Sequence, residues 1–550
     1  MNLPLPAESS LRADRRSALK LGVLGLAGLG SPLAAKAGAR GFTHGVASGE
    51  PGPHQVLLWT RHVGPDETNL SWEVAEDLGF SQIAASGNAL ASPARDCCAK
   101  AMATGLKPGR WYYYRFIAPS GAISPIGRTR TLPVGKVAKF RLAVFSCSNF
   151  AFGWFNAYAH AAEAGDFDLA VHLGDYYYEY PRGIYPADKQ AMAERTLWPA
   201  NETVALADYR QRHATYRADP DLQRLHQILP MLVMWDDHEV ANDTWKDGAE
   251  NHQPDKEGDW AIRKAAFERA WREWLPVSDE DWASYDIGDL ATLFRLESRH
   301  VARTKQLDLI EAVNGVAPDQ VAATYAAFRD GAWRDPAREL LGTMQEAWLA
   351  RQLKASVKAR KPWQIIAQQV VMGELLLPDL VTQNLPAKTP DWLRKRLQST
   401  SAASHAGVPF NMDAWDGYPA ARDRLYQASL AADANLLVLA GDSHNAWAFD
   451  LDRKGARVGV EWGAHSVTSP GAEDALGWLR PDALAKALVA RNPQLKWCDT
   501  AQRGYLAVEL SPSEAIGEFR FLHSVRQKGT RLAGVQRMTV LAGQRKFVAT

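Results

Sequence analysis

The sequence predicts a protein of two parts, a small all-β sandwich followed by a larger α/β region. Three observations lead to this prediction. Residues 41–135 contain short strand-like segments separated by turn signals, whereas from about residue 139 apolar runs alternate with stretches of helical spacing. Four of those apolar runs are followed directly by side chains that can bind metals. The chain of 550 residues is long enough to bury a sizeable core in more than one domain.

Composition places the chain among ordinary soluble globular proteins. Hydrophobic residues make up 46% and charged residues 23% of the chain, which is the usual balance for that class. The formal net charge is only +1 and the sequence has no long basic run, so we do not expect nucleic acid as a partner. The 20 tryptophans are spread along the chain, which indicates core packing rather than one stacking surface.

The first 39 residues have the pattern of an export signal. Paired arginines Arg15 and Arg16 precede an apolar run, Leu21–Ala35, which is shorter than the ~20 residues that a membrane-spanning helix needs. Small residues of cleavage-site type follow at 35–39. The RR-x-x-L-K pattern resembles a twin-arginine signal, although an ordinary secretory signal or a short retained anchor would share most of these features. We therefore expect the twin-arginine machinery to export the protein and residues 1–39 to be removed. The mature protein is then expected to be periplasmic or secreted, without a stable membrane span.

Residues 41–135 are predicted to form an all-β domain. Three segments in this range are rich in β-branched and aromatic residues, namely Val56–Arg61, Leu70–Val74 and Trp111–Ile117. The turn signals EPGP, LKPG and PSG separate them. Strands of this length and spacing predict a small β-sandwich.

Residues 139–550 are predicted to form one α/β catalytic domain. Short apolar runs of the kind that fill buried strands occur at Leu142–Phe145, Leu169–Leu173, Met231–Trp235, Ile365–Val371 and Leu436–Ala440. Segments 257–274 and 338–356 have the spacing of helices. The last fifty residues return to strand-like texture, notably at Gly504–Leu510 and Glu518–Phe521.

The four cysteines do not form a disulfide scaffold. Cys97 and Cys98 are adjacent and cannot both reach one partner, so at least one of them is expected to be free or buried. Cys498 has no evident partner pattern, and Cys147 lies in one of the motifs described next.

Four of the apolar runs end in motifs that contain ligands of metal type. The motifs are SCSN at 146–149, GDYYYE at 174–179, WDDHE at 235–239 and GDSHN at 441–445. Because α/β sheets place their sites at the carboxyl ends of strands, these four motifs are expected to meet in one site.

The residue types in these motifs suit a pair of metal ions. Asp and His bind hard or borderline cations, and a thiolate such as that of Cys147 adds an anionic donor suited to trivalent iron, as does a phenolate. Two metals about 3.5–4 Å apart can hold an attacking hydroxide and stabilise a phosphoryl-transfer transition state, and a carboxylate can bridge them. Asp175 is the natural candidate for that bridge. Gly174 and Gly441 are expected to let the backbone turn sharply off the strands.

The motifs together resemble those of the PhoD-type alkaline phosphatases, a branch of the calcineurin-like metallophosphoesterases. The resemblance also includes HGVASGEP at 44–51, AWDGYPAARDRL at 414–425 and VTSPG at 467–471, and so covers nearly the whole chain. It implies an α/β fold whose core is a two-sheet β-sandwich flanked by helices, with a centre of iron (Fe³⁺) and one or more calcium ions (Ca²⁺).

The resemblance further implies a role for each motif residue. The expected iron ligands are Cys147, Asp175, Tyr178 and His444. Asp175 would bridge to the second metal, which Asp237 and Asp442 also bind, and this carboxylate-rich site favours calcium over zinc. The family pattern selects Asp237 over Asp236, which physics alone does not separate. His238 would face the substrate, stabilising phosphoryl oxygens or protonating the leaving group, while a metal-bound hydroxide attacks in line without a covalent intermediate.

Several of these residues also have simpler interpretations. Tyr178 fits a core aromatic residue as well as a ligand. Arg299 could clamp phosphate through its planar fork, but a solvated or structural arginine fits the sequence as well. His172 is expected to be a satisfied strand residue rather than a ligand. The Trp-rich segment 257–274 could cap the site, although its spacing fits a packed amphipathic helix.

The substrate stays open between two kinds of small phosphoester. The leading expectation is hydrolysis of phosphate monoesters at alkaline pH, and the alternative is hydrolysis of phosphodiesters, including phospholipase-D-like cleavage of lipid headgroups or of cell-wall polymers. A non-catalytic binding protein on the same scaffold would be expected to show a damaged motif, and all four motifs are intact. An adhesion module would account only for residues 41–135.

Overall fold

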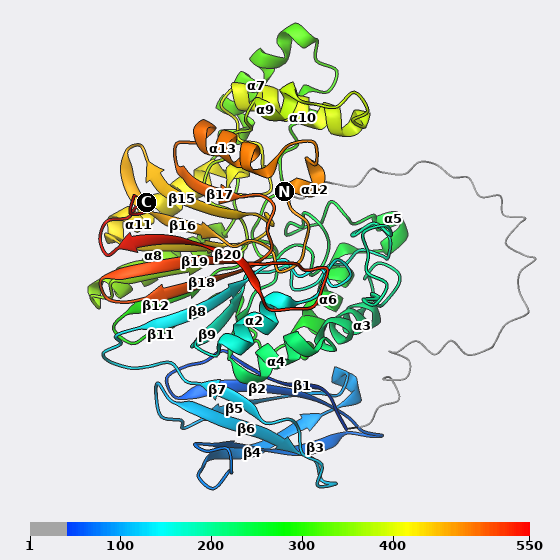
Figure 1. Ribbon diagram of the computed structural model, residues 1–550, viewed down its shortest axis with the longest axis vertical. Coiled ribbons are helices and arrows are strands. Elements are labelled where there is room, and N and C mark those ends of the chain that lie inside the picture. Colours follow the sequence, from blue (N-terminus) through cyan, green and yellow to red (C-terminus); the bar gives the residue numbers. More distant parts are fainter. Residues whose placement is uncertain (1–40, 550) are drawn as a thin grey trace, which may run out of the picture.

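The computed structural model describes residues 41–549, and the predicted signal segment 1–39 lies outside them. Figure 1 shows the N-terminal sandwich at one end of the long axis and helices α7, α9 and α10 at the other, with the large sheets between them. Within the described range, no helix has both the length and the apolar character needed to cross a membrane.

The N-terminal part is a sandwich of two antiparallel sheets. The first sheet has the order β1-β2-β5, formed by Gly41–Gly49, Gln55–Val63 and Cys98–Thr104. The second has the order β4-β3-β6-β7, formed by Ile83–Ala91, Thr68–Ala75, Trp111–Ile117 and Gly127–Arg130. Apolar side chains from both sheets, such as Leu58 and Tyr114, share one buried core. The predicted all-β sandwich is confirmed.

The larger part contains a six-stranded mixed sheet with the order β10-β9-β8-β18-β19-β20. Its strands are Met231–Val233, Leu169–His172, Phe140–Phe145, Gly504–Leu510, Glu514–Leu522 and Leu532–Leu541, in that order. β8, β9 and β10 run parallel, whereas β18 joins β8 in antiparallel orientation. The carboxyl ends of the three parallel strands therefore lie at the same edge of the sheet.

A seven-stranded sheet has the order β11-β12-β13-β14-β16-β15-β17. Its strands are Ala283–Ile287, Ala291–Arg295, Trp363–Ala367, Leu436–Ala440, Ala456–Gly463, Ala446–Arg453 and Leu495–Asp499. The central strands β12, β13, β14 and β16 are parallel to one another.

These two sheets pack face to face, and helices cover their outer faces (Figure 1). One core joins Leu142 and Val171 of the first sheet to Ile365 and Leu437 of the second. On the six-stranded side lie α2 (Asn156–Ala164), α3 (Leu206–Arg217), α4 (Pro220–Ile228) and α6 (Trp260–Trp274). On the seven-stranded side lie α8 (Gly342–Lys358), α10 (Asp391–His405), α11 (Pro419–Ala432) and α13 (Pro481–Arg491). The expected two-sheet core flanked by helices is confirmed.

The remaining helices are short or peripheral. They are α5 (Pro254–Glu257), α7 (Val321–Asp330), α9 (Leu380–Gln383) and α12 (Ala472–Ala475). α7 and α10 share a small apolar cluster of their own around Tyr325 and Trp333.

Some element boundaries differ from the sequence prediction. The run Met231–Trp235 is a strand only to Val233, because the backbone then turns and the amide of Asp236 donates to Glu239, 2.6 Å away. The run that starts at Ile365 belongs to a strand that ends at Ala367. Segment 257–274 becomes a helix only from Trp260, where the Asp259 carboxylate caps the first turn. The helix packs against the core through Phe267 and Trp271.

The N-terminal sandwich is attached to the larger part by buried polar contacts. The indole of Trp59 donates to the carbonyl of Glu273 at 2.8 Å, and the Lys100 ammonium donates to the carbonyl of Val277 at 2.6 Å. Glu50 accepts hydrogen bonds from Arg295 and Tyr285. All four cysteines are buried free thiols, which agrees with the prediction that no disulfide scaffold is present.

Candidate metal centre

The four predicted motifs meet at one edge of the two-sheet core. Cys147, Asp175 and Asp237 follow β8, β9 and β10 of the six-stranded sheet, whereas His444 follows β14 of the seven-stranded sheet. The site is therefore built between the two sheets. This arrangement differs from the single open sheet that the strand-end rule describes.

The backbone at four motif residues adopts an uncommon conformation. The φ angles are 60° at Cys147, 51° at Asp175, 63° at Asp442 and 63° at His444, all in the left-handed region. Non-glycine residues rarely adopt such angles, and when they do they concentrate at functional sites, where the surrounding structure compensates the cost. The tight turns after the strands thus aim these four side chains into one space.

The two motif glycines are required for different reasons. Gly174 has a φ of +113°, and a Cβ there would lie 2.4 Å from the Cβ of Asp236. Gly441 was expected to serve the same sharp turn, but its φ is not in the left-handed region. A Cβ at Gly441 would instead lie 2.3 Å from the Ser146 hydroxyl oxygen, so that close approach excludes any side chain.

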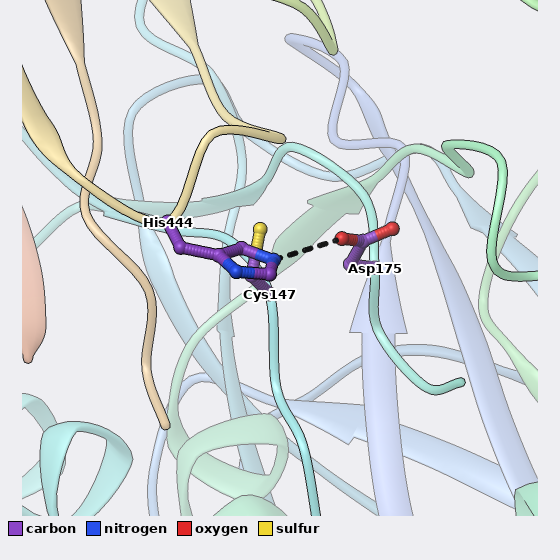
Figure 2. A group of neighbouring side chains, drawn as sticks. All are labelled: Cys147, Asp175 and His444. Carbon is purple, nitrogen blue, oxygen red and sulfur yellow. Dashed lines mark ion pairs between the residues drawn. The ribbon is translucent and has the colours of Figure 1, made fainter. Parts of the chain in front are cut away.

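The first cluster contains the residues expected to bind iron. One ligand atom each from Cys147, Asp175 and His444 lies within 4.8 Å of the others, and the three side chains point toward one another in Figure 2. The Tyr178 hydroxyl lies 3.0 Å from Asp175 Oδ2 and 3.1 Å from His444 Nε2. His444 Nδ1 bonds the carbonyl of Pro470 at 2.7 Å, which leaves Nε2 facing the cluster.

A second and a third cluster adjoin the first. Asp175, Asp237 and His238 again place ligand atoms within 4.8 Å of one another, and so do Asp236, Asp237 and Asp442. Asp175 belongs to both the first and the second cluster. The predicted bridging role of Asp175 requires a residue shared in this way, and it stays a prediction.

A buried carboxylate orients His238. Its Nδ1 lies 2.8 Å from Glu179 Oε2, and the other oxygen of Glu179 accepts hydrogen bonds from the amide of Asn242 at 2.8 Å and from Asn251 at 2.9 Å. Burial disfavours a charged ring, but Asp237 and Glu179 outweigh it and raise the pKa of His238 well above its ordinary value. The sequence analysis did not single out Glu179, although it is the last residue of the GDYYYE motif.

Arg299 lies at the centre of four carboxylates and is fully buried. Its Nε contacts Asp236, its Nη1 lies 2.8 Å from both oxygens of Asp413, and its Nη2 lies 3.3 Å from Asp442 and 3.6 Å from Asp237. The sequence left open whether Arg299 clamps phosphate or has a solvated or structural role, and these buried contacts indicate the structural role. Asp413, just before the AWDGYP motif, was not foreseen as part of this centre.

The donors fit metal cations. Burial, reinforced by Asp237 and Asp442, raises the pKa of Asp175 to about 8, and burial followed by Asp175 raises the pKa of Cys147 and of Tyr178 well above their ordinary values. Among the described residues, Asp175 Oδ1 is buried without a hydrogen-bond partner. Buried acids without enough positive charge are costly, and a cation would supply that charge. Thiol, phenol, imidazole and carboxylate together suit iron(III), whereas the all-carboxylate cluster suits calcium.

Other motif residues have structural roles. His172 bonds the Tyr158 hydroxyl at 2.9 Å and stays away from the clusters, in agreement with the prediction. Tyr176 bonds His226 and Tyr177 bonds the carbonyl of Glu239, so both are core aromatics. Asn149 caps the turn at Phe152.

A two-sheet core flanked by helices, with clustered metal-type ligands at one edge, defines a hydrolase of the metallophosphoesterase class. The family model described as PhoD-like phosphatase matches residues 142–519, and the model described as the PhoD-like phosphatase N-terminal domain matches residues 28–133. The chain belongs to the PhoD-like phosphatase family, and it is a phosphatase.

Two relatives support this assignment. Alkaline phosphatase D of Bacillus subtilis (strain 168) is 31% identical over 517 residues, which cover 90% of this chain and 79% of the relative. A solved structure of PhoD aligns with a TM-score of 0.76 and 28% identity, covering 93% of this chain and 92% of that one. Both the sequence and the fold are thus similar over nearly the whole length.

Proposed function

We propose that this protein is an exported alkaline phosphatase that hydrolyses phosphate monoesters at a centre of iron(III) and calcium. The observation that supports the proposal most directly is the sharing of Asp175 between two ligand clusters. A carboxylate in that position can bind two cations at once, which is the arrangement of two-metal phosphoester hydrolases. The similarity to alkaline phosphatase D supports the same reaction.

The proposed ligands divide between the two metals by their chemistry. Cys147, Asp175, Tyr178 and His444 would hold iron(III). Asp175, Asp237 and Asp442 would hold calcium, with Asp236 beside them. When bound, the two cations would supply Lewis-acid stabilisation of the phosphoryl oxygens and lower the pKa of water at the site.

His238 is proposed to be the catalytic proton donor. Glu179 holds Nδ1, so Nε2 remains for the leaving-group oxygen of the ester. The Glu179 carboxylate favours the protonated ring, which then has a proton to donate as the P–O bond breaks, and the positive charge of the ring also favours the phosphoryl oxygens.

Hydrolysis of phosphodiesters is the second candidate function. A cavity of about 400 Å³ reaches Asp442 and is also lined by Trp245, Lys305, Arg396 and Phe410. Such a cavity leaves room for a second substituent on the phosphorus, including a lipid headgroup or a polymer unit.

The two reactions are separated by parallel assays. We would measure kcat/KM of the enzyme loaded with iron and calcium for 4-nitrophenyl phosphate and for bis(4-nitrophenyl) phosphate. A clear preference for the monoester supports the proposal, whereas a preference for the diester replaces it with the second candidate.

The Asp175→Asn variant tests the metal centre itself. Losing one anionic oxygen at the bridging position should lower kcat/KM on the order of 1,000-fold, because bound metals supply several kcal/mol and each 1.36 kcal/mol is tenfold. Bound iron and calcium, measured by plasma mass spectrometry, should fall in parallel. Asp247→Asn, at an exposed position, is the control and should change neither quantity. Full activity and metal content in Asp175→Asn would refute the assigned centre.

The proposal also includes an export signal and two domains. The signal at 1–39 would direct the folded chain through the twin-arginine route, the sandwich of 41–135 would form one domain and 139–550 the catalytic one. Replacing Arg15 and Arg16 by lysine should retain the activity in the cytoplasm.

A further inference from the structure

A long irregular segment leads from the second motif to α3. Residues 180–205 contain no helix, and their only strand-like feature is an isolated bridge between Gly183 and Ala187. The segment starts directly after Glu179, which holds His238, so it leaves the core at the candidate metal centre. Tyr185, in this segment, is half-buried.

The side chain of Tyr185 lies over the two histidines of the centre. Its ring is nearly parallel to that of His238, with centroids 6.4 Å apart at 14°, and to that of His444, with centroids 6.5 Å apart at 18°. The ring of Tyr178 lies 5.2 Å away. Tyr185 thus spans the space between the proposed proton donor and the proposed iron ligand, which come from different sheets.

The hydroxyl of Tyr185 is poorly satisfied by the protein. Its one hydrogen-bond contact within residues 41–549 is His444 Nδ1, at 3.5 Å. His444 Nδ1 bonds the carbonyl of Pro470, and because a carbonyl can only accept, Nδ1 must carry the hydrogen. Nδ1 therefore cannot accept a hydrogen bond from the Tyr185 hydroxyl. The O–H of Tyr185 is therefore available to an acceptor from outside the protein.

The segment is held in place at both of its ends. The fully buried guanidinium of Arg212, on α3, donates to the carbonyls of Tyr178 and Tyr180 at the start of the segment. It also donates to the carbonyls of Trp198, Pro199 and Asn201 at the far end. Tyr185 is consequently carried by a loop of fixed position.

We propose that Tyr185 is a substrate-binding residue whose hydroxyl donates a hydrogen bond to a phosphoryl oxygen of the ester. The inference rests on the proposed function and extends it to a residue outside the four motifs. A phosphoryl group bound at the cluster that contains His238 would lie near this ring, which is nearly parallel to that of His238. A phenol donating to an anionic oxygen makes a charge-assisted bond, which is stronger than a neutral one.

The test uses the enzyme loaded with iron and calcium and the variants Tyr185→Phe and Tyr185→Leu. Tyr185→Phe removes only the hydroxyl, and should raise both the KM for 4-nitrophenyl phosphate and the inhibition constant of inorganic phosphate by about 10-fold. Metal content and melting temperature should remain as in the wild type. Tyr113→Phe, on the remote strand β6, is the matched control and should change none of these quantities.

Three results would overturn the inference. Unchanged phosphate inhibition in Tyr185→Phe would show that the hydroxyl makes no bond to phosphate. A loss confined to Tyr185→Leu would assign the ring a packing role only, and a fall in bound iron would make the residue a support of the ligands. If the wild type hydrolyses no phosphoester, the proposed function fails, and calorimetric binding of inorganic phosphate to wild type and Tyr185→Phe still decides the role of Tyr185.

Discussion

At the scale of single residues, the candidate centre depends on charges that the protein must balance inside a dry core. Arg299 is the permanent cation in this balance, since a guanidinium stays protonated under all ordinary conditions. It faces Asp236 and Asp413 directly and lies within 4 Å of Asp237 and Asp442. Three of these carboxylates, Asp236, Asp237 and Asp442, also belong to the clusters proposed to bind metals. Arg299 and the proposed metal ions would thus neutralise overlapping sets of acids.

Arg299→Met should make folding depend on calcium. Removing one partner of a buried ion pair typically costs about 3–5 kcal/mol, so the free energy of unfolding of the metal-free variant should fall by roughly that amount. Added calcium should restore part of it, because the ion supplies the missing positive charge. Denaturant unfolding with and without calcium measures both effects.

Arg303→Met is the control for this prediction. Arg303 is equally buried and also contacts Asp413, but within the described residues it forms no ion pair with Asp236 or Asp442. Its loss should destabilise the protein without adding calcium dependence. Equal stabilisation of wild type and Arg299→Met by calcium would contradict the proposal that Arg299 and calcium neutralise the same carboxylates.

At the scale of elements, α3 positions a loop that has no regular structure of its own. Arg212 supplies donors to five carbonyls on both ends of segment 180–205, and the amide of Arg182 closes the loop by donating to the carbonyl of Ala200 at 3.0 Å. Buried backbone carbonyls need partners, and here one side chain replaces the pairing that a helix or sheet would provide.

Arg212→Gln should loosen this loop while leaving the sheets intact. Each buried carbonyl left unpaired costs about 1–3 kcal/mol, so amide hydrogen exchange in segment 180–205 should accelerate at least about tenfold. Arg210→Gln is the control on the same helix, because Arg210 pairs with Glu273 rather than with the loop. Unchanged exchange in the Arg212 variant would show that other contacts hold the loop.

At the scale of the whole molecule, the N-terminal sandwich and the catalytic part share a buried polar interface. Lys100, on β5, donates to the carbonyls of Arg272 and Val277 in the catalytic part. Burial lowers the pKa of Lys100 from 10.5 to about 8, and the nearby carboxylates Asp279 and Glu50 offset this only in part. The protonated lysine is therefore less favoured in the folded state than in the unfolded one.

The stability of the wild type should rise with pH relative to Lys100→Met between about pH 8 and pH 10.5. In this range the unfolded chain holds the proton of Lys100 more tightly than the folded chain, so raising the pH favours folding. Below pH 8 both states are protonated, and the difference should be constant. Melting temperatures of both proteins across this range measure the effect, with Lys107→Met, at an exposed position, as the control. A pH-independent difference would contradict the prediction.

Local sequence determines most of the strands at the site and the motif residues that follow them. The strands that precede the motifs are apolar and short, and ligand-type residues follow each of them within two to four positions, so both could be predicted from the pattern of residues alone. β14 and β18 have the predicted boundaries. The ends of β10 and β13 could not be predicted, because the apolar run continues in each case past the last residue that pairs with a neighbouring strand.

The tertiary structure decided how the motif residues meet and which residues outside the motifs join them. The sequence placed Asp175 and His444 after separate strands, but only the packing of two sheets brings their side chains to within 3.7 Å of each other. Arg299, Asp413, Tyr185 and Arg212 lie outside the four motifs, and their roles arise from contacts between segments far apart in the chain. Local patterns determine which face of a strand is buried and where a ligand can follow it. The long-range packing of sheets and loops determines which of those side chains meet.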